Sequence, residues 1–154
     1  MLLIEDDAFK AKRICKFLAD RFPTHDVAVE RSVSAGLSRI FSSPAPEAIL
    51  LDMSLSTYDV GPRETGGRPQ NFGGIAVLEH MSRRNFLVPV IVITQFDTFP
   101  KDNGEMSLED IRADLKRRFP AAFVDLVYYS SREAAWEGAL ASLLGTVIPN
   151  GSPG

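Results

Sequence analysis

The sequence has few of the residues that would place the chain outside a reducing, aqueous environment. Its 154 residues include a single cysteine, Cys15, so no disulfide can form within the chain, and a cytoplasmic setting is expected. No apolar run approaches the roughly 20 residues of a membrane-spanning helix, and the first residues, MLLIEDD, lack the basic start of a secretion signal. The net charge of −3 argues against a nucleic-acid or membrane surface. The remaining composition, 45% hydrophobic and 24% charged, is typical of one globular domain.

Short strand-like runs alternate with helical periodicity along the whole chain. Strands are expected at residues 2–5, within 26–31, and at 48–51, 88–94 and Phe123–Tyr128. Helices are expected over Ala8–Arg21, 33–41 and 73–84, then after the cap residue Ser107, and over 131–144. Five strands that are each followed by a helix predict a doubly wound α/β fold, (βα)5, with one parallel sheet.

The helix expected over Ala8–Arg21 is amphipathic. Four residues at i, i+3, i+4 and i+7 are expected to form its buried face: Ala11, Ile14, Cys15 and Leu18. Its basic residues are expected to face solvent: Lys10, Lys12, Arg13 and Lys16.

Acidic and hydroxyl side chains stand where three of the strands end. Glu5 and Asp6 end the first strand, Asp52 follows the apolar run ILL, and Thr94 ends the fourth strand. Because binding sites of parallel sheets lie beyond the carboxyl ends of the strands, these side chains are expected to converge. Carboxylates that lie so close together need a cation, and an oxygen-rich cluster suits Mg²⁺.

At these positions the chain resembles the receiver domain of two-component response regulators. LLIEDD, ILLDMS and VIVIT stand in the family's order on strands one, three and four. The resemblance covers about residues 2–144 and implies a flavodoxin-like sheet with strand order 2-1-3-4-5. It makes Asp52 the phosphoacceptor and Thr94 the hydroxyl that hydrogen-bonds the phosphoryl group. It assigns Mg²⁺ to Glu5, Asp6, Asp52 and the backbone carbonyl of Ser54. The resemblance implies a phosphoryl-accepting switch, not an enzyme, with slow self-dephosphorylation at most.

The chain departs from the family at the end of strand five. Receivers carry a lysine there that pairs with the phosphoryl group, whereas this chain has Tyr129 or Ser130, depending on the alignment. Neither side chain supplies a positive charge, and Arg132 is the nearest cation in the sequence.

Two loops beside the site are longer than those of the family. Residues 53–73 form an enlarged loop rich in glycine and arginine, and Arg63 or Arg68 is a candidate replacement for the missing charge. A second enlarged loop is expected at residues 95–106, which suggests a specialised contact near the fourth helix.

The expected organisation is a single receiver-like domain over residues 1–145, followed by a tail or linker over 146–154. No helix-turn-helix follows, so an output partner or a fused effector domain is expected. The other expected partners are a histidine kinase or phosphotransfer protein and a second copy in a homodimer, with no nucleic acid and no membrane.

Two other classes of function compete with the phosphorylated receiver, namely an interaction module and an enzyme, either a phosphatase or a hydrolase. A pseudo-receiver would use the same fold as a phosphorylation-independent interaction module, which the missing lysine and the altered loops favour. A phosphatase of the haloacid-dehalogenase type would need a second aspartate at the position of Ser54. A serine hydrolase would need a G-x-S-x-G motif, which the sequence lacks.

Overall fold

The computed structural model describes residues 1–55, 73–96, 98–101 and 104–148. Its strands are β1 (Leu2–Ile4), β2 (Ala28–Glu30), β3 (Ile49–Leu51), β4 (Val90–Thr94), β5 (Thr98–Lys101), β6 (Gly104–Ser107) and β7 (Phe123–Tyr128). Its helices are α1 (Ala8–Arg21), α2 (Val33–Ile40), α3 (Gly73–Arg83), α4 (Leu108–Arg118) and α5 (Ala135–Val147).

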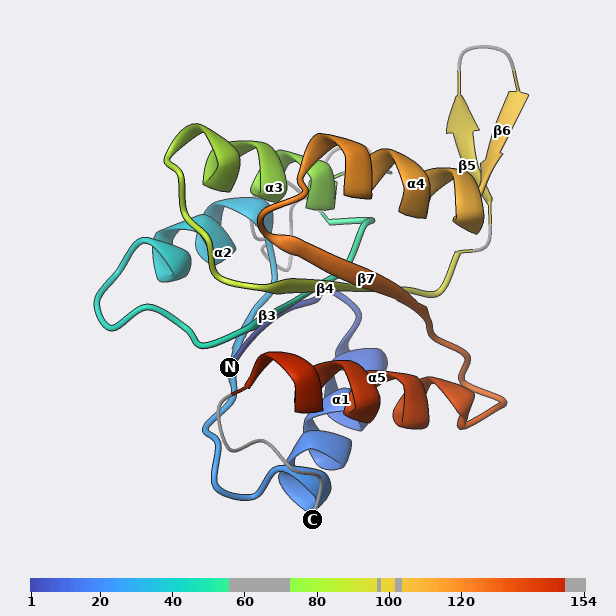
Figure 1. Ribbon diagram of the computed structural model, residues 1–154. Helices are drawn as coiled ribbons and strands as arrows, with labels where there is room; N and C mark the ends of the chain where they lie inside the picture. Colours follow the sequence, from blue (N-terminus) through green and yellow to red (C-terminus); the bar gives the residue numbers. More distant parts are fainter. Residues whose placement is uncertain (56–72, 97, 102–103, 149–154) are drawn as a thin grey trace, which may run out of the picture.

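The main sheet is parallel throughout and has the strand order β2-β1-β3-β4-β7. Helices α2, α3 and α4 cover one face of this sheet, and α1 and α5 cover the other (Figure 1). The predicted doubly wound, flavodoxin-like fold with strand order 2-1-3-4-5 is therefore confirmed, with β7 as the fifth strand.

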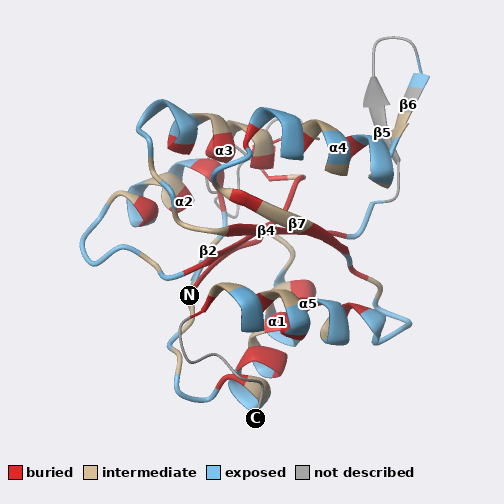
Figure 2. Ribbon diagram, in the orientation of Figure 1, coloured by how far each residue is buried: buried red, intermediate tan, exposed pale blue. Residues whose placement is uncertain are grey.

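Alternate residues of the central strands point into two hydrophobic cores, one on each face of the sheet. On β1, Leu2 and Ile4 belong to the core under α2, α3 and α4, whereas Leu3 belongs to the core under α1 and α5. Trp136 of α5 packs in the second core, where it meets the ring of Phe17 edge-on. The central strands are accordingly buried along their length (Figure 2). Burial on both faces explains why these strands read as continuous apolar runs.

Side-chain caps fix the starts of α1 and α4. The Asp7 carboxylate accepts hydrogen bonds from the backbone N–H groups of Phe9 and Lys10 at the start of α1. Ser107 and Asp110 form the predicted capping box of α4, each side chain accepting from the other's backbone N–H. Caps of this kind stabilise a helix by typically about 1 kcal/mol.

The last helix begins later than the predicted residue 131. It starts at Ala135, and its N-cap Ala134 offers no side-chain hydrogen bond. Upstream, Ser130 Oγ accepts from the backbone N–H of Arg132, and the Ser131 carbonyl accepts from the guanidinium of Arg13. These two contacts hold the segment in a turn, so the prediction that the helix begins at Ser131 was wrong.

The predicted enlarged loop at 95–106 contains a β-hairpin. Strands β5 and β6 pair antiparallel, with Thr98 opposite Ser107 and Lys101 opposite Gly104. Gly104 has a φ of 135°, a conformation that side-chain-bearing residues rarely adopt. The hairpin stands beside the start of α4, away from the sheet (Figure 1).

The far end of the described chain is the end of α5. Ile148 is the helix C-cap and is buried against the core under α1 and α5. The domain boundary after residue 145 and the tail over 146–154 stay predictions. Across the described ranges, no helix has the length and apolar character needed to cross a membrane.

Candidate functional site

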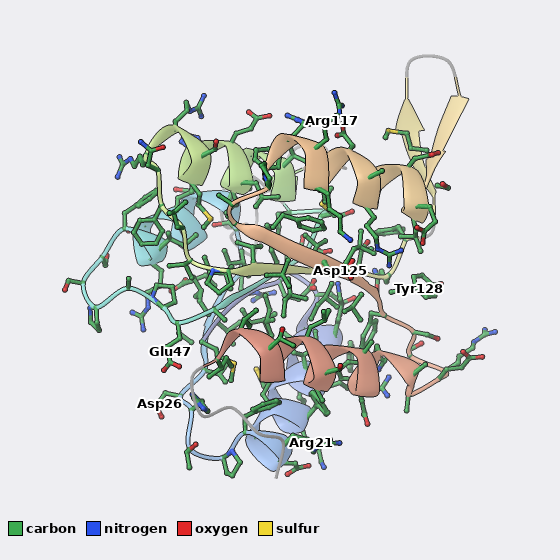
Figure 3. The ribbon with its side chains drawn as sticks, in the orientation of Figure 1. Arg21, Asp26, Glu47, Arg117, Asp125 and Tyr128 are labelled. Carbon is green, nitrogen blue, oxygen red and sulfur yellow. The ribbon has the colours of Figure 1, made fainter. Side chains whose placement is uncertain are left out.

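The predicted acidic side chains gather at the carboxyl-terminal edge of the sheet. Tyr128, the last residue of β7, marks this edge in Figure 3, and Glu47, just before β3, marks the opposite one. Glu5 directly follows β1, Asp52 directly follows β3, and Thr94 is the last residue of β4. All three side chains are buried, with exposed fractions of 2%, 4% and 0%.

Three carboxylates form a compact cluster at this edge. Glu5, Asp6 and Asp52 each place an oxygen so that the three atoms lie within 4.8 Å of one another. Glu5 and Asp52 are buried, whereas Asp6 is half-buried and borders solvent. Three hard oxygen donors with one open side match what Mg²⁺ or a similar divalent cation prefers. Asp7 is engaged elsewhere, because its carboxylate caps α1.

The prediction that Lys10 faces solvent was wrong, because its side chain ends inside the acidic cluster. Its side chain is 2% exposed, and its Nζ lies 2.6 Å from Glu5 Oε2 and 3.3 Å from Asp52 Oδ1. The same ammonium donates a hydrogen bond to the Ile93 carbonyl at 2.9 Å. The site therefore contains a buried cation, although the end of strand five supplies none.

The direction of helical side chains explains how Lys10 reaches the site. Side chains lean toward the start of their helix, and only Glu5, Asp6 and Asp7 separate the start of α1 from the end of β1. Lys10 is the third residue of α1, a position where the helix dipole disfavours a cation. A lysine three residues after the acidic run and four residues before the apolar Ile14 is the signal in the sequence from which its burial could have been predicted.

Burial and crowding of negative charge raise the pKa values of Glu5 and Asp6. Burial, with a smaller contribution from Asp52, raises the pKa of Glu5 to about 8 against the opposing effect of Lys10. Burial and the charge of Asp52 also raise the pKa of Asp6 above its usual value. Glu5 Oε2 has no hydrogen bond of good geometry among the described residues, although Lys10 Nζ lies near it. A cation bound here would favour the charged form of both groups.

The ends of β4 and β7 form the wall next to Asp52. Thr94 Oγ1 accepts a hydrogen bond from the backbone N–H of Phe96 at 3.2 Å, so the hydroxyl proton is free of that bond. The Thr94 carbonyl accepts from the backbone N–H of Tyr129, the first residue after β7. Tyr129 is buried, and its ring centroid lies 5.7 Å from Lys10 Nζ. An aromatic ring therefore packs beside the ammonium at the end of strand five.

Two adjacent glycines bring α3 against the backbone beside Asp52. A Cβ on Gly74 would lie 2.5 Å from the Asp52 carbonyl oxygen, and one on Gly73 would lie 2.4 Å from that of Leu55. The Gly74 N–H donates to the Met53 carbonyl at 2.9 Å. The start of α3 thus holds the chain that follows Asp52 in place.

Gly74→Ala is expected to lower the free energy of unfolding by about 1–3 kcal/mol, because backbone atoms must move to admit the methyl group. Gly138→Ala is the matched control, since Gly138 is exposed in α5 and a Cβ there has no neighbour within 4 Å. That control should gain up to about 1 kcal/mol from the helix propensity of alanine. Chemical denaturation followed by circular dichroism compares the two; a gain in both would contradict the close approach.

The remaining predicted site residues lie at the border of the described chain. Ser54, whose carbonyl is predicted to bind the metal, is half-buried two positions after Asp52. Arg63 and Arg68, the predicted replacements for the missing charge, lie outside the described residues, as does most of the loop at 53–73. Arg132, the nearest cation in the sequence, is exposed.

The solved structures that align with this chain include response regulators and their receiver domains. The Mn²⁺-bound form of the response regulator Rcp1 aligns with a TM-score of 0.63 and 16% identity, over 97% of this chain and 94% of Rcp1. The phosphorylated cyanobacterial phytochrome response regulator RcpA aligns with a TM-score of 0.64 and 18% identity, over 95% of this chain and 91% of RcpA. At these identities the similarity defines the fold: the chain has the fold of response-regulator receiver domains.

Sequence relatives extend over nearly the whole chain. The uncharacterized protein y4jR of Sinorhizobium fredii is 30% identical over 142 residues, which cover 90% of this chain and 92% of y4jR. The Detocs response regulatory protein DtcB of Enterobacter cloacae is 25% identical over 138 residues, which cover 88% of this chain and 92% of DtcB. No family model matches the sequence. The chain belongs to the family of y4jR.

Proposed function

We propose that the protein is a phosphoryl-accepting receiver in which Asp52 is the phosphoacceptor. The observation that carries this proposal is the position of Asp52, which is buried within 4.8 Å of two further carboxylates and ion-paired with a buried lysine. Burying several carboxylates together costs free energy, and clusters of such groups are concentrated at functional sites.

The chemistry is a transfer of one phosphoryl group to an oxygen of Asp52. The donor is a phosphorylated histidine of a histidine kinase or phosphotransfer protein. The new O–P bond forms as the N–P bond breaks, and the histidine nitrogen leaves with the electron pair. Thr94, whose hydroxyl proton is not used in the contact with Phe96, donates to a phosphoryl oxygen once the group is attached.

Glu5, Asp6, Asp52 and the Ser54 carbonyl would hold a divalent cation, with Mg²⁺ as the proposed ion. Their hard oxygen donors fit it, and the cation supplies charge neutralisation at the phosphoryl oxygens. The Mn²⁺-bound form of Rcp1 supports divalent metal binding at a receiver fold, and phosphorylated RcpA supports phosphoryl acceptance.

The position of Lys10 weakens the pseudo-receiver hypothesis. That alternative depended on the lack of a cation at the site, and the ammonium of Lys10 lies 3.3 Å from Asp52. We therefore infer a working switch that acts in the cytoplasm on an output partner, a fused effector domain or a second copy of the chain. As a switch it performs no catalysis beyond slow loss of its own phosphoryl group.

The test is the intact mass of the protein after incubation with phosphoramidate and Mg²⁺. Wild type is expected to gain one phosphoryl group, and Asp52→Asn is expected to gain none because it lacks the attacking oxygen. Asp26→Asn, an exposed aspartate before β2 at the opposite edge, is the matched control and should behave as wild type. Wild type that stays unmodified while circular dichroism shows it folded would contradict the proposal and favour the pseudo-receiver.

A further inference from the structure

We propose that Lys10 binds the phosphoryl group on Asp52, so that the first turn of α1 supplies the positive charge that the end of strand five lacks. This inference rests on the proposed function and adds the residue that recognises the phosphoryl oxygens. It replaces Arg63, Arg68 and Arg132 as the candidate cation.

The contacts of Lys10 allow its ammonium to bind a negatively charged group attached to Asp52. An ammonium has three N–H donors, and Lys10 Nζ faces three acceptors: Glu5 Oε2 at 2.6 Å, the Ile93 carbonyl at 2.9 Å and Asp52 Oδ1 at 3.3 Å. The distance to Asp52 is the longest of the three. The bond to Ile93 ties the ammonium to the edge of the sheet and keeps it beside the phosphoacceptor.

Phosphorylation changes which of these contacts is favourable. When Asp52 becomes an acyl phosphate, its carboxylate charge is lost, and a group with up to two negative charges replaces it. The donor that pointed at Oδ1 then has a more negative acceptor within reach, and charge-assisted hydrogen bonds of this kind are among the strongest in proteins. Lys10 can make this exchange without leaving Ile93.

Other cations near the site have different partners in the described part of the chain. Arg13 donates to the Tyr129 hydroxyl at 3.2 Å and to the Ser131 carbonyl at 3.0 Å. Arg31 donates to the backbone carbonyl of Asp6. Lys10 is the one described Lys or Arg that forms an ion pair with Asp52.

The position of Tyr129 also supports the assignment of Lys10. Tyr129 is one of the two residues that can stand in place of the strand-five lysine, is 4% exposed, and packs against Trp136 at 5.2 Å between ring centroids. Its ring also lies beside the Lys10 ammonium, 5.7 Å from Nζ. An aromatic ring therefore lies at the end of strand five, and the ammonium beside Asp52 comes from α1.

The test compares Lys10→Met with Lys12→Met. Both remove one lysine charge from α1, but Lys12 is exposed. Lys10→Met is expected to slow phosphorylation of Asp52 by phosphoramidate about tenfold or more, since a hydrogen bond to a charged group is lost. With saturating Mg²⁺, its affinity for beryllofluoride, a phosphoryl mimic, should fall by a similar factor, while its Mg²⁺ affinity should not fall. A merely structural lysine would leave the beryllofluoride affinity unchanged relative to Mg²⁺ binding.

The outcomes separate this inference from the proposed function. If wild type takes up no phosphoryl group, the proposed function fails, and the inference fails with it. If wild type is modified and Lys10→Met matches it in rate and beryllofluoride affinity, Lys10 is not the phosphoryl-binding cation, although the receiver function stands. If Lys10→Met does not fold, NMR of wild type labelled at the lysine ¹³Cε positions decides. The Lys10 signal must shift on adding beryllofluoride with Mg²⁺, and an unchanged signal overturns the inference.

Discussion

Asp6→Asn is expected to raise the Mg²⁺ concentration for half-maximal phosphorylation of Asp52 by at least about tenfold, because it removes a charged ligand from the proposed metal site. Of the three clustered carboxylates, Glu5 and Asp52 share the ammonium of Lys10, whereas Asp6 forms no ion pair among the described residues. Asp6 is also half-buried, on the side of the cluster that borders solvent. Asp6 is thus the carboxylate of the cluster whose negative charge is most available to a divalent cation.

Asp7→Asn provides the control for this variant. It removes the same charge from the neighbouring residue, and asparagine caps a helix as well as aspartate does, so α1 should remain intact. Mg²⁺ titrations by calorimetry, together with phosphorylation by phosphoramidate at each Mg²⁺ concentration, give the two apparent affinities. Equal shifts in both variants would mean that net charge near the sheet edge, not a ligand at Asp6, controls the metal.

The acidic half of the site follows from local sequence patterns. Glu5 and Asp52 each come directly after an apolar run that is buried on both faces, and Thr94 ends another. In a parallel sheet the ends of such runs meet at one edge whatever the loops do. The sequence therefore predicts the cluster without any knowledge of side-chain packing.

The basic half of the site was not predicted, because the expected stripe of Ala11, Ile14, Cys15 and Leu18 leaves Lys10 out. The buried face of α1 instead consists of Lys10, Ile14, Phe17 and Leu18, at i, i+4, i+7 and i+8. From this face the Lys10 side chain extends toward the start of the helix, where it meets three acceptors. The energetic reason is electrostatic, since Glu5 and Asp52 need a cation more than the first turn of α1 resists one.

Two further features, the later start of α5 and the hairpin of β5 and β6, were not predicted from the sequence. The turn before α5 is held by hydrogen bonds of Ser130 and Ser131, one of which comes from Arg13, far away in the sequence. The hairpin is a two-stranded sheet of its own, and its strands have four residues each. These strands contain Pro100 and Gly104, residue types that sequence patterns associate with turns and loops.

A lysine introduced at the end of strand five should restore the phosphorylation rate that Lys10→Met loses. In the double variant Lys10→Met with Tyr129→Lys, the rate of phosphorylation by phosphoramidate is expected to recover about tenfold relative to Lys10→Met alone, as the charged hydrogen bond returns. Tyr129 directly follows β7, its N–H binds the Thr94 carbonyl, and its ring already lies beside Lys10 Nζ. A lysine there enters the site along the path that the ring now fills.

The neighbouring position provides the control, because successive strand residues point to opposite sides. Tyr128 is 46% exposed and lies at the outer end of β7 (Figure 3), so Lys10→Met with Tyr128→Lys adds the same charge but directs it to solvent. This second double variant should stay as slow as Lys10→Met. Recovery in both would reduce the role of Lys10 to net charge, and recovery in neither would show that α1 and strand five are not equivalent sources of the cation. Recovery from Tyr129 alone would mean that the site requires an ammonium beside Asp52 and accepts it from either element.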